Sequence, residues 1–246
     1  MFGLDEWIAG LGAGHSVILS IVVAVLLGLR HATDPDHLSA VSTLVAAEPD
    51  RRAHQAMRMG LAWGAGHATT LFVFGVPIIL FASYLPPQVG RLAEAAIGLL
   101  IIGLAARLLV RWRRGQLHVH EHEHEGRGHR HLHGHTRASA DAHAGLPVRS
   151  SLAAYSIGLV HGLGGSAGVG LLLLASISNR VTAIAALVLF AVFTAISMTL
   201  CSGAFGMALS ARAVRRGFDR LAPILGVASM TFGVWYVTMA LAPHPF

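Results

Sequence analysis

Long apolar stretches, separated by shorter polar segments, dominate the hydrophobic pattern of this chain. A helix that crosses the hydrocarbon core of a bilayer needs about 20 apolar residues. Stretches of this kind lie at residues 14–33, 57–82, 90–112, 152–175, 181–209 and 221–242. The pattern therefore predicts an all-α integral membrane protein with about six transmembrane helices.

A polar, low-complexity segment divides these helices into two groups of three. We expect a first transmembrane half at 1–112, a histidine-rich loop at 113–150 and a second transmembrane half at 151–246. Nine of the sixteen histidines lie in the loop, interleaved with glutamate, arginine and glycine. Such a segment has few apolar side chains to bury, so we expect it to be disordered when no ligand is bound.

The arginines gather in alternate connections between the predicted helices. Three arginines follow the first helix (Arg51, Arg52 and Arg58), eight lie from Arg107 to Arg149, four lie from Arg212 to Arg220, and the other two connections carry one each. Because short Arg-rich connections stay in the cytoplasm, we place the histidine-rich loop there and both termini outside, in a bacterial-type cytoplasmic membrane. The net charge of +6 then follows from topology and requires no nucleic-acid partner.

Composition excludes several other classes of protein. Hydrophobic residues make up 54% of the chain and charged residues 12%, whereas soluble domains have about 25% charged residues. The single cysteine, Cys201, excludes an intramolecular disulfide framework, and the absence of lysine excludes a Walker A loop. No glutamate follows a histidine in a predicted helix, as the H-E-x-x-H helix of a metalloprotease requires, so we predict that the protein is not an enzyme. The N-terminus has no basic region, so the first apolar stretch is predicted to be a retained span.

The sequence LRHATDPDHLSAV follows the first apolar run and concentrates ionisable residues at the end of a predicted span. An ionisable residue in a membrane segment costs about 2.5–3.5 kcal/mol and commonly belongs to an ion pathway. Pro35 disfavours a continuous helix, so side chains on both sides of a break could turn toward one ion. The candidate metal ligands are His31, Asp34, Asp36 and His37. The alternative is an interfacial turn in which Asp36 caps the next helix.

Two further histidines lie near the middle of predicted spans. His67 is in the second apolar stretch and His161 is in the fourth. A lone histidine on an apolar face is more often a hydrogen-bonded packing residue than a ligand. Glycines near both are spaced as G-x-x-x-G, which allows helices to approach closely, at Gly60 and Gly64, Gly158 and Gly162, and Gly164 and Gly168. Close approach would bring both imidazoles toward the broken segment, which favours the metal-site reading.

Histidines in the loop form a second candidate metal-binding region. Imidazoles interleaved with carboxylates suit borderline divalent metals such as zinc, nickel, cobalt and copper. The alternatives are a solvated polar linker and a purification tag, although a tag is usually a terminal run of consecutive histidines. The residues predicted to capture metal are His118, His120, His122, His124, His129, His131, His133 and His135.

These motifs resemble the nickel/cobalt transporter family. His31, Asp36 and His37 are similar to its H-x-x-x-x-D-H motif, and Gly66-His67 is similar to its second Gly-His motif. The stretch GLVHGLGGSAG resembles the shorter branch named after a urease accessory membrane protein, in which a histidine replaces an aspartate. Pro35 departs from the commonest pattern, which has alanine. The resemblance implies coordination by the first motif, with His67 and His161 further along the path.

The resulting prediction is transport of Ni²⁺ or Co²⁺ as substrate, with no resident cofactor. Moving a divalent cation through 100 mV is worth about 4.6 kcal/mol, or a concentration ratio of roughly two thousand, so the membrane potential is sufficient for uptake. Export of nickel, cobalt or zinc, and a non-transporting metal sensor or metallochaperone for an enzyme such as urease, are the alternatives. The lipid bilayer, a second copy of the chain and a cytoplasmic metallochaperone are the macromolecular partners considered.

Overall fold

The structure is a computed structural model that describes residues 17–47, 53–81, 86–115, 117–124, 127–134, 151–162, 164, 166–211, 214 and 217–242, with the backbone alone at 117–134. Within these ranges lie eight helices: α2 (Val17–His31), α3 (Pro35–Ala46), α4 (Ala53–Phe81), α5 (Pro87–Arg113), α6 (Ser151–His161), α7 (Ser166–Ala175), α8 (Arg180–Ser210) and α10 (Phe218–Leu241).

The helical, membrane-spanning character predicted from the sequence is confirmed. Four of the described helices are long and apolar enough to cross a membrane: α4, α5, α8 and α10. Helices α2 and α3, bent by 41° at their break, would together form a fifth span. The predicted stretch 152–175 is divided into α6 and α7, each too short to span alone, and three glycines lie between 162 and 165, where glycine disfavours a helix. Six spans remain a prediction.

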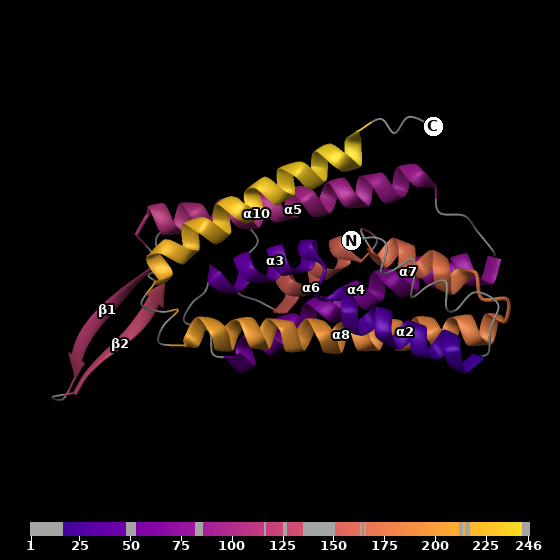
Figure 1. The fold of residues 1–246 in the computed structure, drawn as a ribbon, viewed down its shortest axis with the longest axis horizontal. Coiled ribbons are helices and arrows are strands. Elements are labelled where there is room, and N and C mark those ends of the chain that lie inside the picture. The colour runs from indigo at the N-terminus through magenta and orange to yellow at the C-terminus, as the bar shows by residue number, and fades with distance from the viewer. Residues whose placement is uncertain are drawn as a thin grey trace.

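The helices form a bundle with α3 at its centre. Figure 1 shows α5 and α10 along one side of the bundle and α2 with α8 along the opposite side. Between them, α3 contacts α5, α10 and α8, while α4 packs against both α8 and α6. Helices from before and after the histidine-rich segment therefore pack directly on one another. The division of the chain into two transmembrane halves, 1–112 and 151–246, stays a prediction from the sequence.

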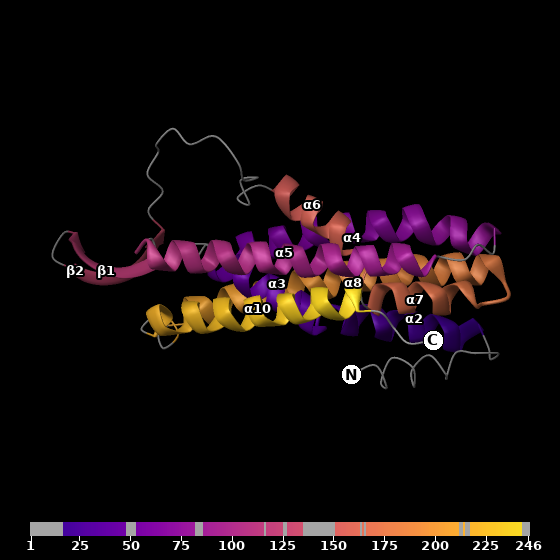
Figure 2. The same ribbon diagram turned by 90° about the horizontal axis from the view of Figure 1, so that it is seen from above.

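The described helix ends that flank the arginine-rich connections after α5 and α8 lie at one end of the bundle. Figure 1 shows the end of α5, the end of α8 and the start of α10 together at this end, with the hairpin projecting beyond it. Figure 2 shows the same projection from above. The end of α4 and the start of α5 lie at the opposite end. The alternation of arginine-rich and arginine-poor connections thus corresponds to the two ends of the molecule.

The interior contains two hydrophobic clusters with the buried histidines between them. One cluster gathers apolar residues of α3, α4, α5, α6, α8 and α10, and the other those of α2, α4, α7 and α8. His37 lies against Trp63 of the first cluster, and His31 lies against Phe190 of the second. Many large apolar side chains, such as Leu92, remain exposed on the outer faces, as expected for helices in contact with lipid.

Two strands pair in the described backbone of the histidine-rich loop, whose disorder in the absence of ligand stays a prediction. Residues Leu117–His124 form β1 and residues Arg127–Gly134 form β2, and the two strands pair antiparallel. An antiparallel hairpin satisfies backbone donors and acceptors without a hydrophobic core. The sequence argument considered only the burial of apolar side chains, so it did not anticipate this pairing.

Candidate metal centre

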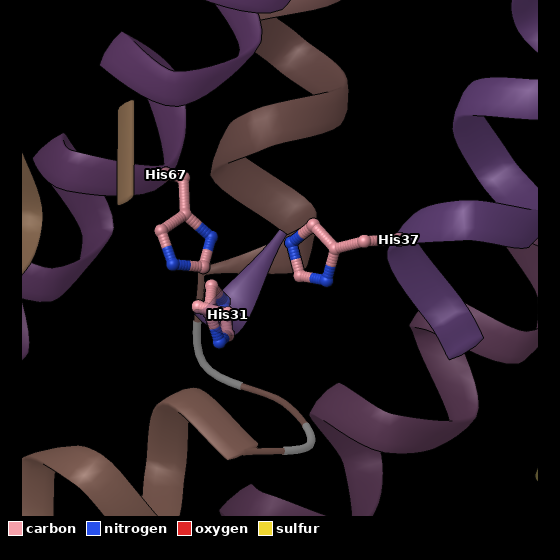
Figure 3. Close-up of side chains that lie close together, drawn as sticks. All are labelled: His31, His37 and His67. Carbon is pink, nitrogen blue, oxygen red and sulfur yellow. The ribbon is translucent and has the colours of Figure 1, made fainter. Parts of the chain in front are cut away.

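Four histidine side chains from four helices meet inside the bundle. His31 ends α2, His37 lies in the first turn of α3, His67 is in the middle of α4, and His161 ends α6. Each is at most 2% exposed. Ring centroids are 4.2 Å apart for His37 and His161, 4.4 Å for His31 and His37, and 4.7 Å for His31 and His67. Figure 3 shows three of these rings, His31, His37 and His67, around one common space.

The break between α2 and α3 is what delivers ligands from both helices. The chain leaves α2 in a turn in which the Thr33 backbone amide and Oγ1 donate to the Arg30 carbonyl at 2.9 and 2.6 Å. Pro35 then starts α3. Proline is tolerated there because the first residue of a helix has no intrahelical partner for its backbone N–H. The helix break predicted at Pro35 is confirmed. Asp36 and His37 are both buried, and the N-cap of α3 is Asp34, so Asp36 does not cap this helix as the alternative proposed.

Glycines allow α4 and α6 to approach closely enough to bring His67 and His161 to the same region. A Cβ at Gly66 would overlap a backbone carbonyl of α6, and a Cβ at Gly158 would overlap the Trp63 carbonyl of α4. The close helix approach predicted from the G-x-x-x-G spacing is therefore found at Gly158. Gly66 takes part although it lies outside the spaced pairs.

Replacing Gly158 with alanine should destabilise the folded protein, because the new Cβ would force α6 away from the Trp63 carbonyl. Overpacking of this kind costs about 1–3 kcal/mol. Thermal unfolding in detergent, followed by intrinsic fluorescence, measures the effect. The matched control is Gly103→Ala in α5, where a Cβ meets no atom within 4 Å and alanine is expected to be neutral or slightly stabilising. Equal unfolding temperatures for the two variants would contradict the packing argument.

Potential ligand atoms form two groups of three that share one histidine. One group, here called the imidazole triad, is His31, His37 and His67; the other, the carboxylate triad, is Asp36, His37 and His161. Within each triad one ligand atom from every residue lies within 4.8 Å of the other two. These separations are compatible with coordination of one ion after small side-chain adjustments, since metal–nitrogen bonds are about 2.0–2.1 Å long.

Hydrogen bonding differs between the two triads. His161 Nε2–H donates to Asp36 Oδ2 at 3.0 Å, and His37 Nδ1 lies 3.5 Å from Asp36 Oδ1. Both ring nitrogens of His67, Nε2 of His37 and Nδ1 of His161 are buried and make no hydrogen bond to any residue that the structure describes. A buried polar atom left unpaired costs about 1–3 kcal/mol. Several such atoms around one space are what a site for a nitrogen-ligated cation would present.

Asp34 lies behind His31 and belongs to neither triad. Its Oδ1 is 3.4 Å from Arg30 NH2, and its Oδ2 is 3.5 Å from His31 Nδ1. A carboxylate on one imidazole nitrogen fixes the ring's orientation and leaves the other nitrogen for a metal. The structure therefore gives Asp34 the position of an orienting group, and direct ligation by Asp34 stays a prediction.

Trp63 is a component of the site that the sequence did not reveal. Its ring stacks on His37 with centroids 5.7 Å apart and meets His161 edge-on at 5.5 Å. It lies one helical turn before His67 on α4 and is 1% exposed. The only sequence signal was its place in WGAGH, and an aromatic residue in an apolar helix looks the same when it packs in an ordinary core.

A small cavity lies beside His31, away from His161. Its lining residues are Leu27, Arg30, His31, Val169, Gly170, Leu173 and Phe190, from α2, α7 and α8. Its volume is about 10 Å³, which is room for about one water molecule. Within the described chain, this cavity reaches the imidazole triad at His31.

The predicted loop ligands are placed only by the backbone register of the hairpin. Three cross-strand pairs bring histidines opposite one another: His118 with His133, His120 with His131, and His122 with His129. His124 is opposite Arg127, and His135 lies outside the described residues. Metal capture by these histidines remains a prediction.

Comparisons with known proteins agree with the motifs. A protein named urease accessory protein UreH from Bacillus sp. (strain TB-90) is 31% identical over 225 residues, which cover 89% of this chain and 91% of that protein. A high-affinity nickel transport protein from Cupriavidus necator is 31% identical over 138 residues, 48% of this chain and 39% of that protein. No solved structure is detectably similar. Residues 17–242 match the NicO family model, described as high-affinity nickel-transport protein. The resemblance drawn from the sequence is thus confirmed, and the chain belongs to the NicO family of high-affinity nickel-transport proteins.

Proposed function

We propose that this protein transports Ni²⁺ or Co²⁺ through the buried site at the break between α2 and α3. The observation that carries the proposal is the meeting of four buried imidazoles and one carboxylate from four different helices. Burial of so many ionisable groups in a membrane-spanning bundle is costly and is typical of an ion pathway. The family membership and the name of the Cupriavidus relative support nickel as the substrate.

The donor set favours a transition metal over the common divalent cations. Imidazole is a preferred ligand of nickel, cobalt, copper and zinc, whereas Mg²⁺ and Ca²⁺ prefer shells made of oxygen. The imidazole triad offers three nitrogens and no carboxylate, and the carboxylate triad offers two nitrogens and one oxygen donor. Both triads therefore discriminate against Mg²⁺ and Ca²⁺ by chemistry, while the choice between nickel and cobalt is not encoded in donor type.

The direction that we propose is uptake driven by the membrane potential. The arginine distribution supports an orientation with the hairpin end in the cytoplasm and both termini outside. An inside-negative potential of 100 mV supplies about 4.6 kcal/mol for a divalent cation, and neither a lysine-containing nucleotide loop nor another energising motif is needed. The histidines of the hairpin then buffer the ion or pass it to a cytoplasmic metallochaperone, and assembly into a homo-oligomer is compatible with this arrangement.

Flux measured in vesicles tests the proposal. Purified protein in lipid vesicles with an imposed inside-negative potential should accumulate radiolabelled nickel or cobalt toward a ratio of roughly two thousand at 100 mV. Vesicles without protein, and protein-containing vesicles without a potential, should remain near equilibrium. A wild-type protein that binds nickel but passes none would contradict transport by the isolated chain.

One relative is named as a urease accessory protein, so a second function, metal binding without transport, has to be distinguished from transport. A membrane metallochaperone or sensor would use the same ligands to bind nickel, without flux. An exporter would share ligands and flux, but deletion of its gene would make cells metal-sensitive instead of metal-starved. Flux in vesicles together with the growth phenotype of a deletion strain therefore distinguishes the three activities.

A further inference from the structure

We infer that the imidazole triad and the carboxylate triad are two successive, mutually exclusive stations for one cation, and that His37 remains bound while the ion passes between them. This inference rests on the proposed transport function and specifies how the site would carry it out. It assigns different roles to residues that the sequence motifs treat alike. His31 and His67 serve the first station, Asp36 and His161 serve the second, and His37 serves both.

Exclusivity follows from the chemistry of a shared imidazole. Neutral imidazole has one nitrogen that carries a proton and one with a free lone pair, so it coordinates one metal ion at a time. His37 belongs to both triads, and it is fully buried. Two divalent ions held on either side of this ring would also repel strongly in a poorly polarisable interior. Each chain is therefore expected to hold one ion, at one station or the other.

The arrangement of the rings permits a handover in which the ion is never without ligands. The described ring contacts run in order from His67 to His31, His37 and His161, with centroid separations of 4.7, 4.4 and 4.2 Å. His37 lies between the other rings and is also 5.7 Å from His67. A shift of a few ångströms by the ion would exchange two ligands and keep the third.

The order of the stations is suggested by access and by hydrogen bonding. The small cavity reaches His31 and touches no residue of the carboxylate triad. In the carboxylate triad, Asp36 Oδ2 already accepts a hydrogen bond from His161 Nε2 at 3.0 Å, so an ion that binds either of these two atoms must displace this contact. In the imidazole triad, the ring nitrogens of His37 and His67 make no hydrogen bond to any residue that the structure describes. The ion is therefore expected at the imidazole triad first and at the negatively charged triad second.

Trp63 closes the space beside the second station. Its ring touches His37 and His161, and it comes before His67 on a helix that starts at the arginine-rich connection. With the proposed orientation, Trp63 is on the cytoplasmic side of His67. An ion at the carboxylate triad is thus held against this ring until the site opens inward.

The test loads Co²⁺ onto the purified full chain and reads its ligands by X-ray absorption, since imidazole and carboxylate give distinguishable scattering. In every protein tested, all nine loop histidines, the eight from His118 to His135 and also His143, are replaced by serine. The protein with no further change should bind one ion per chain within the helices. His161→Ala should retain one ion with three imidazole ligands. His67→Ala should retain one ion with two imidazoles and a carboxylate. His54→Ala, which removes an exposed histidine of α4, should behave as wild type.

Retained binding in each single variant also shows that the variant is folded. If either alanine variant aggregates, His67→Gln and His161→Gln, which keep a polar side chain of similar length, are measured instead. Loss of binding in both folded glutamine variants would overturn the inference in favour of one merged site. Two ions per wild-type chain, or the same ligand set in both variants, would overturn it as well.

Flux separates the two-station inference from the proposed function. With two stations in series, His67→Ala and His161→Ala should each lower nickel flux at least tenfold while still binding one ion. Full flux in either variant, with wild-type transport intact, would overturn the two stations and leave the transport function standing. No flux in wild type, with the two ligand sets found as expected, would instead overturn the transport function.

Discussion

Replacing His37 with alanine should abolish potential-driven accumulation of nickel and cobalt. His37 is the member common to both groups of potential ligands, and its ring contacts His31, His67 and His161. Removing even an outer partner of a metal ligand typically lowers metal affinity 10–100-fold, so loss of a ligand shared by two stations should exceed about 100-fold in both binding and flux.

The measurement compares initial rates of uptake into vesicles that contain equal amounts of folded wild-type or variant protein. His54→Ala is the matched control, because His54 is an exposed histidine near the start of α4. Its flux should equal that of wild type. Substantial flux in His37→Ala, with an unchanged unfolding temperature, would show that the ion does not pass through either triad.

Replacing Asp36 with asparagine should stop passage of the metal ion almost as completely, because it removes a negative charge from the pathway. The substitution keeps the shape of the side chain but removes the only carboxylate in the two triads. At an effective dielectric constant of 20, a divalent cation and a carboxylate 4 Å apart attract each other by on the order of 8 kcal/mol. Desolvation offsets much of this, and we expect flux to fall by about two orders of magnitude. Binding at the imidazole triad should weaken but persist.

Isothermal titration with nickel and vesicle flux, measured on the same preparations, test this separation of binding from passage. Asp219→Asn is the control, since Asp219 is an exposed carboxylate in the first turn of α10. Asp36→Glu restores the charge and should recover part of the flux. Wild-type flux in Asp36→Asn would exclude the carboxylate from the pathway.

The sequence was informative for features that depend on residues close together in the chain. The helix break at Pro35 could be predicted because the proline ring constrains its own backbone and that of the preceding residue. His67 and His161 could be proposed as ligands because glycine spacing near each of them indicated close helix packing, which the structure shows at Gly158. The division of the fourth apolar stretch into α6 and α7 was missed, because hydropathy averaged over a window does not register a short run of glycines.

Other features could not be predicted because they depend on contacts between segments far apart in the chain. The hairpin in the histidine-rich loop was not expected, since backbone pairing is independent of the apolar content that the sequence argument used. Asp34 and Asp36 look equivalent in the motif, yet one faces Arg30 and His31 and the other faces His161. Asp34 is the N-cap of α3 and Asp36 lies in its first turn, and only the direction of each side chain in the folded protein separates their roles.

The amino-acid sequence by itself determined the membrane-spanning helices, the broken first segment and the family to which the chain belongs. Each of these is set by hydrophobicity, by proline stereochemistry or by residues within one short motif. The tertiary structure alone decided that α5 packs with α10, that Trp63 covers the site and that His37 lies between two groups of ligands. The reason is physical: ligand groups are defined by distances of a few ångströms between side chains on different helices, and those distances depend on how the helices pack against one another.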